Sequence, residues 1–172
     1  MKLEDIPKFP RATYQVNVGW DYINKFWEGL NVNLDPDYQR GYVWSQYQKE
    51  RYIEYRLQGG FSGKDIFWNC PNWNFNGGTA GWNDTLELVD GKQRINAVRG
   101  FMNDEVRAFG FLKSEYTDSH RMSGIHHDLI FHVNNLQTKK EVIEWYLGMN
   151  AGGSIHTEDD LLVSRNLLTS LK

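Results

Sequence analysis

The stretch LELVDGKQRINAV, residues 86–98, carries a strand into a helix through one glycine. A buried strand is predicted over Thr85–Val89, and the helical spacing of apolar residues begins at Ile95, just after Gly91. A helix that starts in this way points its first backbone N–H groups into open space, where they carry the positive end of the helix dipole. Gly91 has no Cβ, so a ligand can come close to the backbone. The stretch therefore predicts an anion site at a corner that ties a sheet to a helix.

The side chains around this glycine suit a phosphate ligand. Arg94 can hold a phosphate with its planar fork, and Lys92 adds a point charge. Asp90 can orient a water molecule or hold Mg²⁺, and Gln93 can position a nucleophile. A second interpretation stays open on these residues alone, in which Asp90-x-x-Gln93 is a capping box and the two cations are simply solvated.

The composition limits the function classes. The net charge is −3 and the pI is about 5.9, which argues against a large basic surface for duplex DNA but leaves room for a local basic cleft. The single cysteine, Cys70, excludes an internal disulfide and a cysteine-based zinc site, and we expect it to be a buried, inert thiol. Residues 1–172 fit one domain. With no signal sequence and no run of about 18 apolar residues, we expect no membrane span and a cytosolic protein of a bacterium or a phage-infected host.

Helices and strands are mixed along the chain, which predicts an α+β or mixed α/β class, of which α+β is favoured. Two helices have capping boxes, Ser45-x-x-Gln48 and Thr138-x-x-Glu141. The expected helices span 19–30 (with a stripe of Trp20, Ile23, Trp27 and Leu30), 45 to Gly59-Gly60, 95–102, 138 to Gly152-Gly153, and from Thr157 onward with Leu161, Leu162, Leu168 and Leu171 as the apolar positions. The expected strands span 65–69, 85–89, 106–112 and 129–133.

Two predicted loops are rich in aromatic residues. Within residues 31–44, Arg40 can complete a phosphate site, and Tyr38, Tyr42 or Trp44 can stack on a base. The alternative is a loop that its aromatic side chains anchor in the core. The loop 71–83 is long for a compact domain, and we expect it to be mobile or to contact a protein partner.

A metal cluster at His126-His127-Asp128 is disfavoured. Adjacent side chains on a strand point to opposite faces, so they rarely share one ion. We expect these three residues to be surface residues.

Three ordered segments resemble motifs of the GmrSD N-terminal family, also called domain of unknown function 262. They are LDPDYQRGYVWSQYQKERYIEYRLQGG (34–60), LELVDGKQRINAVRGF (86–101) and EVIEWYLGMNAGGSIHTEDDL (141–161). In residue terms, the first motif covers Tyr38, Gln39 and Arg40, the second covers Asp90, Gly91, Gln93 and Arg94, and the third covers Asn150. Lys92 departs from the family pattern, in which Gln is common at this position.

The resemblance implies a ParB/sulfiredoxin-like fold, a small mixed sheet flanked by helices. In that superfamily the strand–glycine–helix corner binds phosphate. The resemblance also implies a nucleoside triphosphate ligand, for which Asp90 is a possible Mg²⁺ ligand. No histidine has the His-x-x-Pro spacing of the nuclease half of longer members, so DNA cleavage by a second half is not expected. Short members resemble phage or mobile-element proteins of defence or anti-defence.

Three functions follow as hypotheses. The favoured one is a nucleoside triphosphate hydrolase, in which Asp90, Gln93 and Arg94 are catalytic. The ligand-binding residues would be Tyr38, Gln39, Arg40, Gly91, Lys92 and Asn150. The alternatives are a non-catalytic protein that binds a nucleotide or a host factor, and a ParB-like DNA-binding or nicking module, against which the acidic pI counts.

Overall fold

The computed structural model describes residues 2–6, 8, 10–12, 14–26, 28, 30–73, 85–118, 127–150 and 158–171. Its centre is a mixed sheet of five strands in the order β1-β5-β3-β4-β2. The strands are β1 (Tyr14–Gly19), β2 (Asn31–Asn33), β3 (Asp65–Asn69), β4 (Thr85–Asp90) and β5 (Asp128–Asn134). β1 and β5 pair antiparallel, as do β3 and β4, whereas β3 pairs with β5 and β2 with β4 in parallel.

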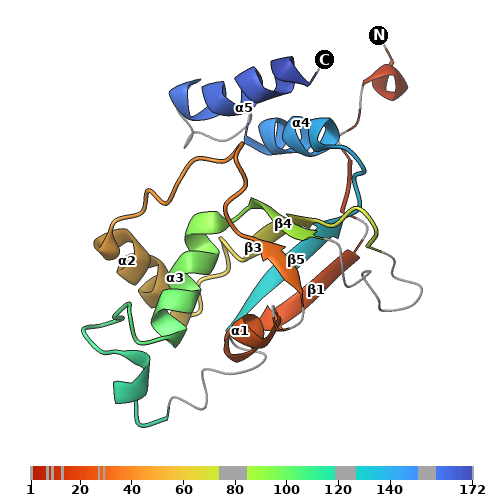
Figure 1. Ribbon diagram of the computed structural model, residues 1–172. Helices are drawn as coiled ribbons and strands as arrows, with labels where there is room; N and C mark the ends of the chain where they lie inside the picture. Colours follow the sequence, from red (N-terminus) through yellow and green to blue (C-terminus); the bar gives the residue numbers. More distant parts are fainter. Residues whose placement is uncertain are drawn as a thin grey trace.

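Helices cover the sheet on both faces. The long helices are α2 (Gln46–Leu57), α3 (Lys92–Met102), α4 (Lys139–Asn150) and α5 (Glu158–Ser170). Figure 1 shows α2 and α3 at one side of the sheet and α4 with α5 above it. The short segments are α1 (Ile23–Phe26) and the 3₁₀ turns Leu3–Asp5, Trp20–Tyr22 and Lys113–Glu115. The α+β class with a mixed sheet flanked by helices is therefore confirmed.

The strands divide their side chains between two cores, as their period of two requires. One face sends Trp68, Leu88 and Phe131 into the main core, which α2 and α3 complete. The opposite face sends Val89 and Phe67 toward α4, where Trp145 and Tyr146 complete a smaller core.

Local sequence signals placed several boundaries correctly. Ser45 caps α2, and its side chain and that of Gln48 bond reciprocally to each other's backbone N–H. Thr138 and Glu141 make the same exchange before α4. β3, β4 and β5 lie where the sequence predicts strands.

The prediction for residues 19–30 is wrong in extent. Among the described residues of this range, which leave out Trp27 and Gly29, the helical ones are Trp20–Tyr22 and Ile23–Phe26, and strands lie on both sides at Tyr14–Gly19 and Asn31–Asn33. Trp20 and Ile23 are buried, so their spacing correctly marks a buried turn. The two strands were missed because both lie at edges of the sheet and are held by pairing with distant strands.

The strand predicted over 106–112 is also wrong. Ala108 and Phe111 bridge each other across a tight turn, in which Phe109 has φ +50° and Gly110 has φ +84°. Positive φ at two central residues is the geometry of a reversal, so the chain cannot continue as a strand. The apolar run is split between buried Val106 and Ala108 and exposed Phe109 and Phe111.

Two further expectations need correction. Leu162 on α5 and Leu171 just after it are exposed, whereas Leu168 packs against the smaller core as predicted, together with Leu167, and Ser164 is buried. The side chain of Leu161 lies outside the described residues. Asp128 is not a surface residue but is 5% exposed. Cys70 is buried and in no disulfide, as predicted.

Some predictions lie outside the described residues. These are most of the loop 71–83, residue His126, the Gly152-Gly153 helix end and the Thr157 cap. In the described part of the chain, no helix is both long and apolar enough to cross a membrane.

Candidate functional site

A cavity of about 420 Å³ opens where α2, the start of α3 and the end of α4 meet. Figure 1 shows the loop between β2 and α2 rising toward the C-terminal end of α4 before it turns down to α2. We call this space the arginine cavity, and the described residues that line it are Arg40, Trp44, Tyr52, Tyr55, Ser62, Gly63, Asp90, Gly91, Gln93, Arg94 and Asn150. Residues from all three motifs therefore meet at one place.

The corner before α3 supplies the charged floor of the cavity. Arg94 Nη2 donates to Asp90 Oδ2 at 2.6 Å, and both side chains keep part of their surface exposed. The guanidinium carries five N–H donors, and this ion pair uses one of them. The pair can therefore present a carboxylate and further N–H donors to the same ligand.

Gly91 is needed at this corner for two physical reasons. Its φ is +104°, in the left-handed region that residues with a Cβ rarely adopt. A Cβ built here would also lie 2.5 Å from Ile66 Cδ1 and 3.2 Å from Ile66 Cα. The glycine lets the α3 N-terminus pack directly on β3, which fixes where the first N–H groups of α3 point.

The capping-box interpretation of Asp90 and Gln93 is wrong. Gly91 is the N-cap of α3 and makes no side-chain cap bond, while Asp90 pairs with Arg94. The Gln93 amide turns to the preceding loop instead. Its Nε2 donates to the Gly41 carbonyl at 3.0 Å, and its Oε1 accepts from the N–H groups of Val43 and Trp44 at 3.1 and 3.2 Å.

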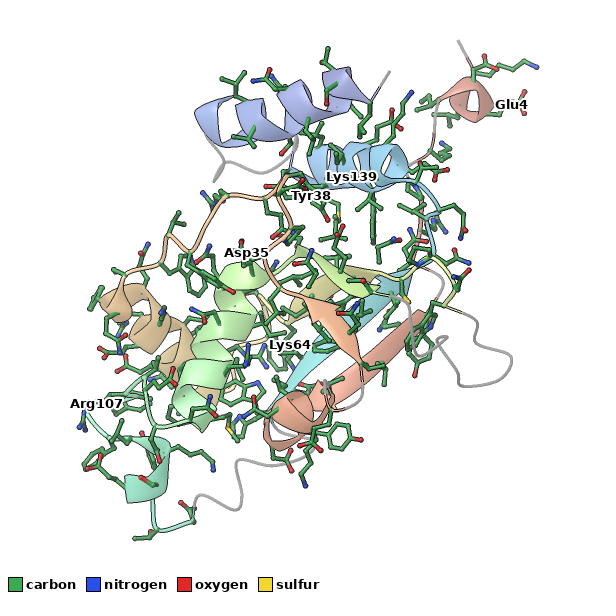
Figure 2. All side chains as sticks on the ribbon, viewed as in Figure 1. Glu4, Asp35, Tyr38, Lys64, Arg107 and Lys139 are labelled. Atoms are coloured by element: carbon green, nitrogen blue, oxygen red, sulfur yellow. The ribbon has the colours of Figure 1, made fainter. Side chains whose placement is uncertain are left out.

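Lys92 does not line the arginine cavity. It is 5% exposed, forms an ion pair with Asp35, donates to the Arg40 carbonyl at 3.0 Å and lies 5.0 Å from the centre of the Tyr42 ring. Figure 2 shows Asp35 beside the first turn of α3. The ammonium group therefore holds the 35–42 segment in this structure, rather than facing the cavity.

Tyr38 and Gln39 also hold the loop and do not line the cavity. Tyr38 is fully buried, and its hydroxyl donates to Glu87 at 2.8 Å. Burial, together with the Glu87 carboxylate, raises the pKa of Tyr38 well above its ordinary value. Gln39 Nε2 donates to the carbonyls of Leu88 and Val89. With Lys92, Gln39 lines a neighbouring hollow of about 40 Å³, which has room for about one water molecule and shares Arg40, Asp90 and Gln93 with the arginine cavity.

Asn150 ends α4 at the wall of the cavity. It is 9% exposed, and its Nδ2 donates to the Tyr146 carbonyl at 2.7 Å, one helical turn earlier. Its side chain is therefore held in place from within α4.

The opposite wall is aromatic, and most of it was missed from the sequence. Trp44 was predicted as a stacking residue, and its ring centre lies 5.4 Å from that of Tyr52. Tyr52 donates to the Gly63 carbonyl at 2.7 Å, and the hydroxyls of Tyr55 and Ser62 are 2.8 Å apart. A signal was present, because Tyr52 and Tyr55 are three apart on a capped helix and flank the core residue Ile53.

Metal ligands are few at this site. Asp90 is the one carboxylate among the described residues that line the arginine cavity. In the described ranges, no three His, Cys, Asp or Glu side chains come together as a metal site. A divalent ion would therefore need oxygen ligands from a bound phosphate and from water, which is how Mg²⁺ is commonly held.

Comparison with known proteins identifies the family. The family model for the N-terminal domain of the GmrSD restriction endonuclease matches residues 21–146. The chain belongs to this family. No curated protein and no solved structure matches it. The match covers the first two motifs and the corner at Asp90–Arg94, while kinship with the ParB/sulfiredoxin superfamily stays a prediction.

Proposed function

We propose that this chain binds a nucleoside triphosphate in the arginine cavity and hydrolyses its terminal phosphoanhydride bond. One observation carries the proposal: Arg40, Arg94 and the N-terminus of α3 share a cavity with the rings of Trp44, Tyr52 and Tyr55. Cations with a helix N-terminus suit phosphates, and flat aromatic walls suit a base. The volume of about 420 Å³ lies in the range of small-molecule sites.

The charged side of the cavity supplies the groups that phosphoryl transfer needs. A water oxygen attacks the γ-phosphorus, the bond to the β-phosphate oxygen breaks, and negative charge develops on the leaving oxygen. Arg40, Arg94 and the N–H groups after Gly91 stabilise that charge. Asp90 accepts a hydrogen bond from the attacking water or binds the Mg²⁺ that enters with the nucleotide.

Family membership supports the wider setting of this activity. The family model describes the N-terminal domain of the GmrSD restriction endonuclease. We therefore propose that the nucleotide reaction serves a restriction-type system, with a protein partner or a further domain as its target.

The test is release of inorganic phosphate from each of the four common nucleoside triphosphates with Mg²⁺. We expect turnover by the wild type and a loss of about 100-fold or more in Arg94→Gln, because one transition-state donor is removed. Asp90→Asn should also lose turnover while it retains binding. Arg51→Gln is the matched control, since Arg51 is an exposed arginine on α2 that pairs only locally with Glu54.

The outcomes separate the hypotheses. Nucleotide binding by the wild type without turnover would replace the hydrolase with a non-catalytic binding module. Absence of both binding and turnover for all four nucleotides would refute the proposal. DNA binding that weakens with salt and is unchanged in Arg94→Gln would point to a nucleic-acid surface elsewhere on the molecule.

A further inference from the structure

The Gln93 side chain forms its hydrogen bonds with one short loop. It is 9% exposed, and all three of its hydrogen bonds go to the backbone of residues 41–44. The loop lies between β2 and α2 and belongs to no helix or strand. Within the described part of the chain, residues 41–44 make no hydrogen bond to another backbone group. The Gln93 amide therefore supplies the hydrogen-bond partners that the backbone groups of Gly41, Val43 and Trp44 need.

Residues 41–43, in the middle of the loop, make few other contacts. Tyr42 and Val43 are 48% and 51% exposed, and nothing lies within 4 Å of a Cβ built on Gly41. Loops with few buried contacts open at low free energy. The Trp44 ring packs partly against the main core and lies 5.4 Å from the Tyr52 ring, and the bond to Gln93 Oε1 fixes the Trp44 backbone beneath it.

Lys92 also holds the backbone of this loop, at Arg40, the residue before Gly41. It donates to the carbonyl of Arg40, and its charge is balanced by Asp35. Two consecutive residues at the start of α3 therefore hold the two ends of the segment Arg40–Trp44. We call this pair of attachments the loop clasp.

We propose that Gln93 is a positioning residue that acts on the nucleotide through Trp44, and that Lys92 does the same through Arg40. The proposal rests on the nucleotide function proposed above. It assigns the two residues between Gly91 and Arg94 to building the wall of the cavity, and leaves Asp90 and Arg94 to face the ligand.

A double-mutant cycle on nucleotide affinity tests the role of Gln93. We expect Gln93→Leu to raise the Kd for a nucleoside triphosphate about tenfold, since three hydrogen bonds of the loop are lost. If Gln93 acts only through Trp44, the Gln93→Leu/Trp44→Ala protein binds no more weakly than Trp44→Ala alone. Losses that multiply would mean direct contact between Gln93 and the ligand, and would overturn the proposal.

A second cycle tests Lys92 with inorganic triphosphate as the probe. This probe has no base, so it reports on Arg40 and not on Trp44. We expect Lys92→Met to weaken triphosphate binding, and the Lys92→Met/Arg40→Ala protein to bind triphosphate no more weakly than Arg40→Ala alone. Gln93→Leu should change triphosphate affinity less than nucleotide affinity. An equal loss for both probes would contradict the division of roles.

Amide hydrogen exchange tests the clasp without any ligand. In Gln93→Leu the amides of Val43 and Trp44 should exchange at least about tenfold faster than in the wild type, while those inside α2 stay unchanged. Gln93→Glu keeps the acceptor oxygen and should preserve most of this protection, even if Gln93→Leu folds poorly. Gln58→Leu, at an exposed site after α2, is the matched control.

This experiment also separates the two proposals. Unchanged exchange at residues 43 and 44 in Gln93→Leu would overturn the clasp whatever the ligand is. If exchange is faster in Gln93→Leu but the wild type binds no nucleotide, the loop clasp is supported and only the proposed function is refuted.

Discussion

At the residue scale, neighbouring side chains of the corner Asp90–Arg94 have different partners. Asp90 and Arg94 pair with each other at the cavity, while Lys92 and Gln93 turn to the loop. All lie within one helical turn, so the direction of each side chain decides its role. Gly91 makes the corner possible, because a residue with a Cβ would be strained there and would collide with Ile66.

Gly91→Ala is expected to lower the free energy of unfolding by roughly 3 kcal/mol, from backbone strain plus the contact with Ile66. The measurement is urea denaturation followed by circular dichroism. Gly41→Ala is the control, since a Cβ at Gly41 has nothing within 4 Å. Similar stabilities of the two variants would show that the corner tolerates a side chain.

At the element scale, α2 fastens the glycine-rich loop that follows it. Tyr52 donates to the Gly63 carbonyl, and Tyr55 accepts from the Ser62 N–H at 3.2 Å. The same two tyrosines form the aromatic wall of the arginine cavity. The helix therefore shapes both the loop and the site.

The Tyr52 hydroxyl predicts a pH dependence of stability. Burial raises the pKa of Tyr52 from 10.0 to about 12. The stability that the protonated Tyr52 contributes is fully present below pH 10 and is lost as pH rises toward 12, because only the unfolded chain releases the proton in that interval. In this interval the free energy of unfolding falls by up to about 1.4 kcal/mol per pH unit because of this tyrosine.

The comparison is Tyr52→Phe against wild type at pH 8 and pH 11, by urea denaturation. At pH 8 the variant should be less stable by about 1 kcal/mol, for the lost bond to Gly63. At pH 11 the difference should shrink or reverse, because phenylalanine does not titrate. The other tyrosines are common to both proteins and cancel. A gap that stays constant between the two pH values would contradict the argument.

At the scale of the whole molecule, Asp128 ties distant parts of the chain together. Its carboxylate accepts from Lys64 at 2.7 Å and from Asn17 at 2.8 Å, and Arg56 Nη2 lies 3.8 Å away. Arg56 also donates to the Asp128 backbone carbonyl at 3.0 Å and is 1% exposed. One carboxylate thus joins β1, β5, α2 and the segment before β3.

Asp128→Asn is expected to cost about 3 kcal/mol of unfolding free energy, because Arg56 and Lys64 lose their counter-charge. Equilibrium urea denaturation measures it. Asp65→Asn is the matched control, since Asp65 is half-exposed and pairs with His132 at a less buried site. Ordinary surface substitutions change the free energy of unfolding by up to about 0.5 kcal/mol. A smaller loss than this in Asp128→Asn would mean that the network contributes little to stability.

The sequence by itself determined the parts of this protein that depend on neighbouring residues. Hydrophobic spacing and the capping residues Ser45 and Thr138 placed α2, α4 and the central strands. The glycine between strand and helix marked the corner at which the arginine cavity opens. These signals are local, since they depend on residues within about one helical turn.

Only the tertiary structure decided which residues of the motifs face that cavity. Tyr38, Gln39 and Lys92 hold the loop by bonds to groups 49 to 57 positions away in the chain. The edge strands β1 and β2 likewise depend on partner strands far away in the chain. A side chain can point to a ligand or to a neighbouring backbone at equal local cost, and packing between remote segments makes that choice.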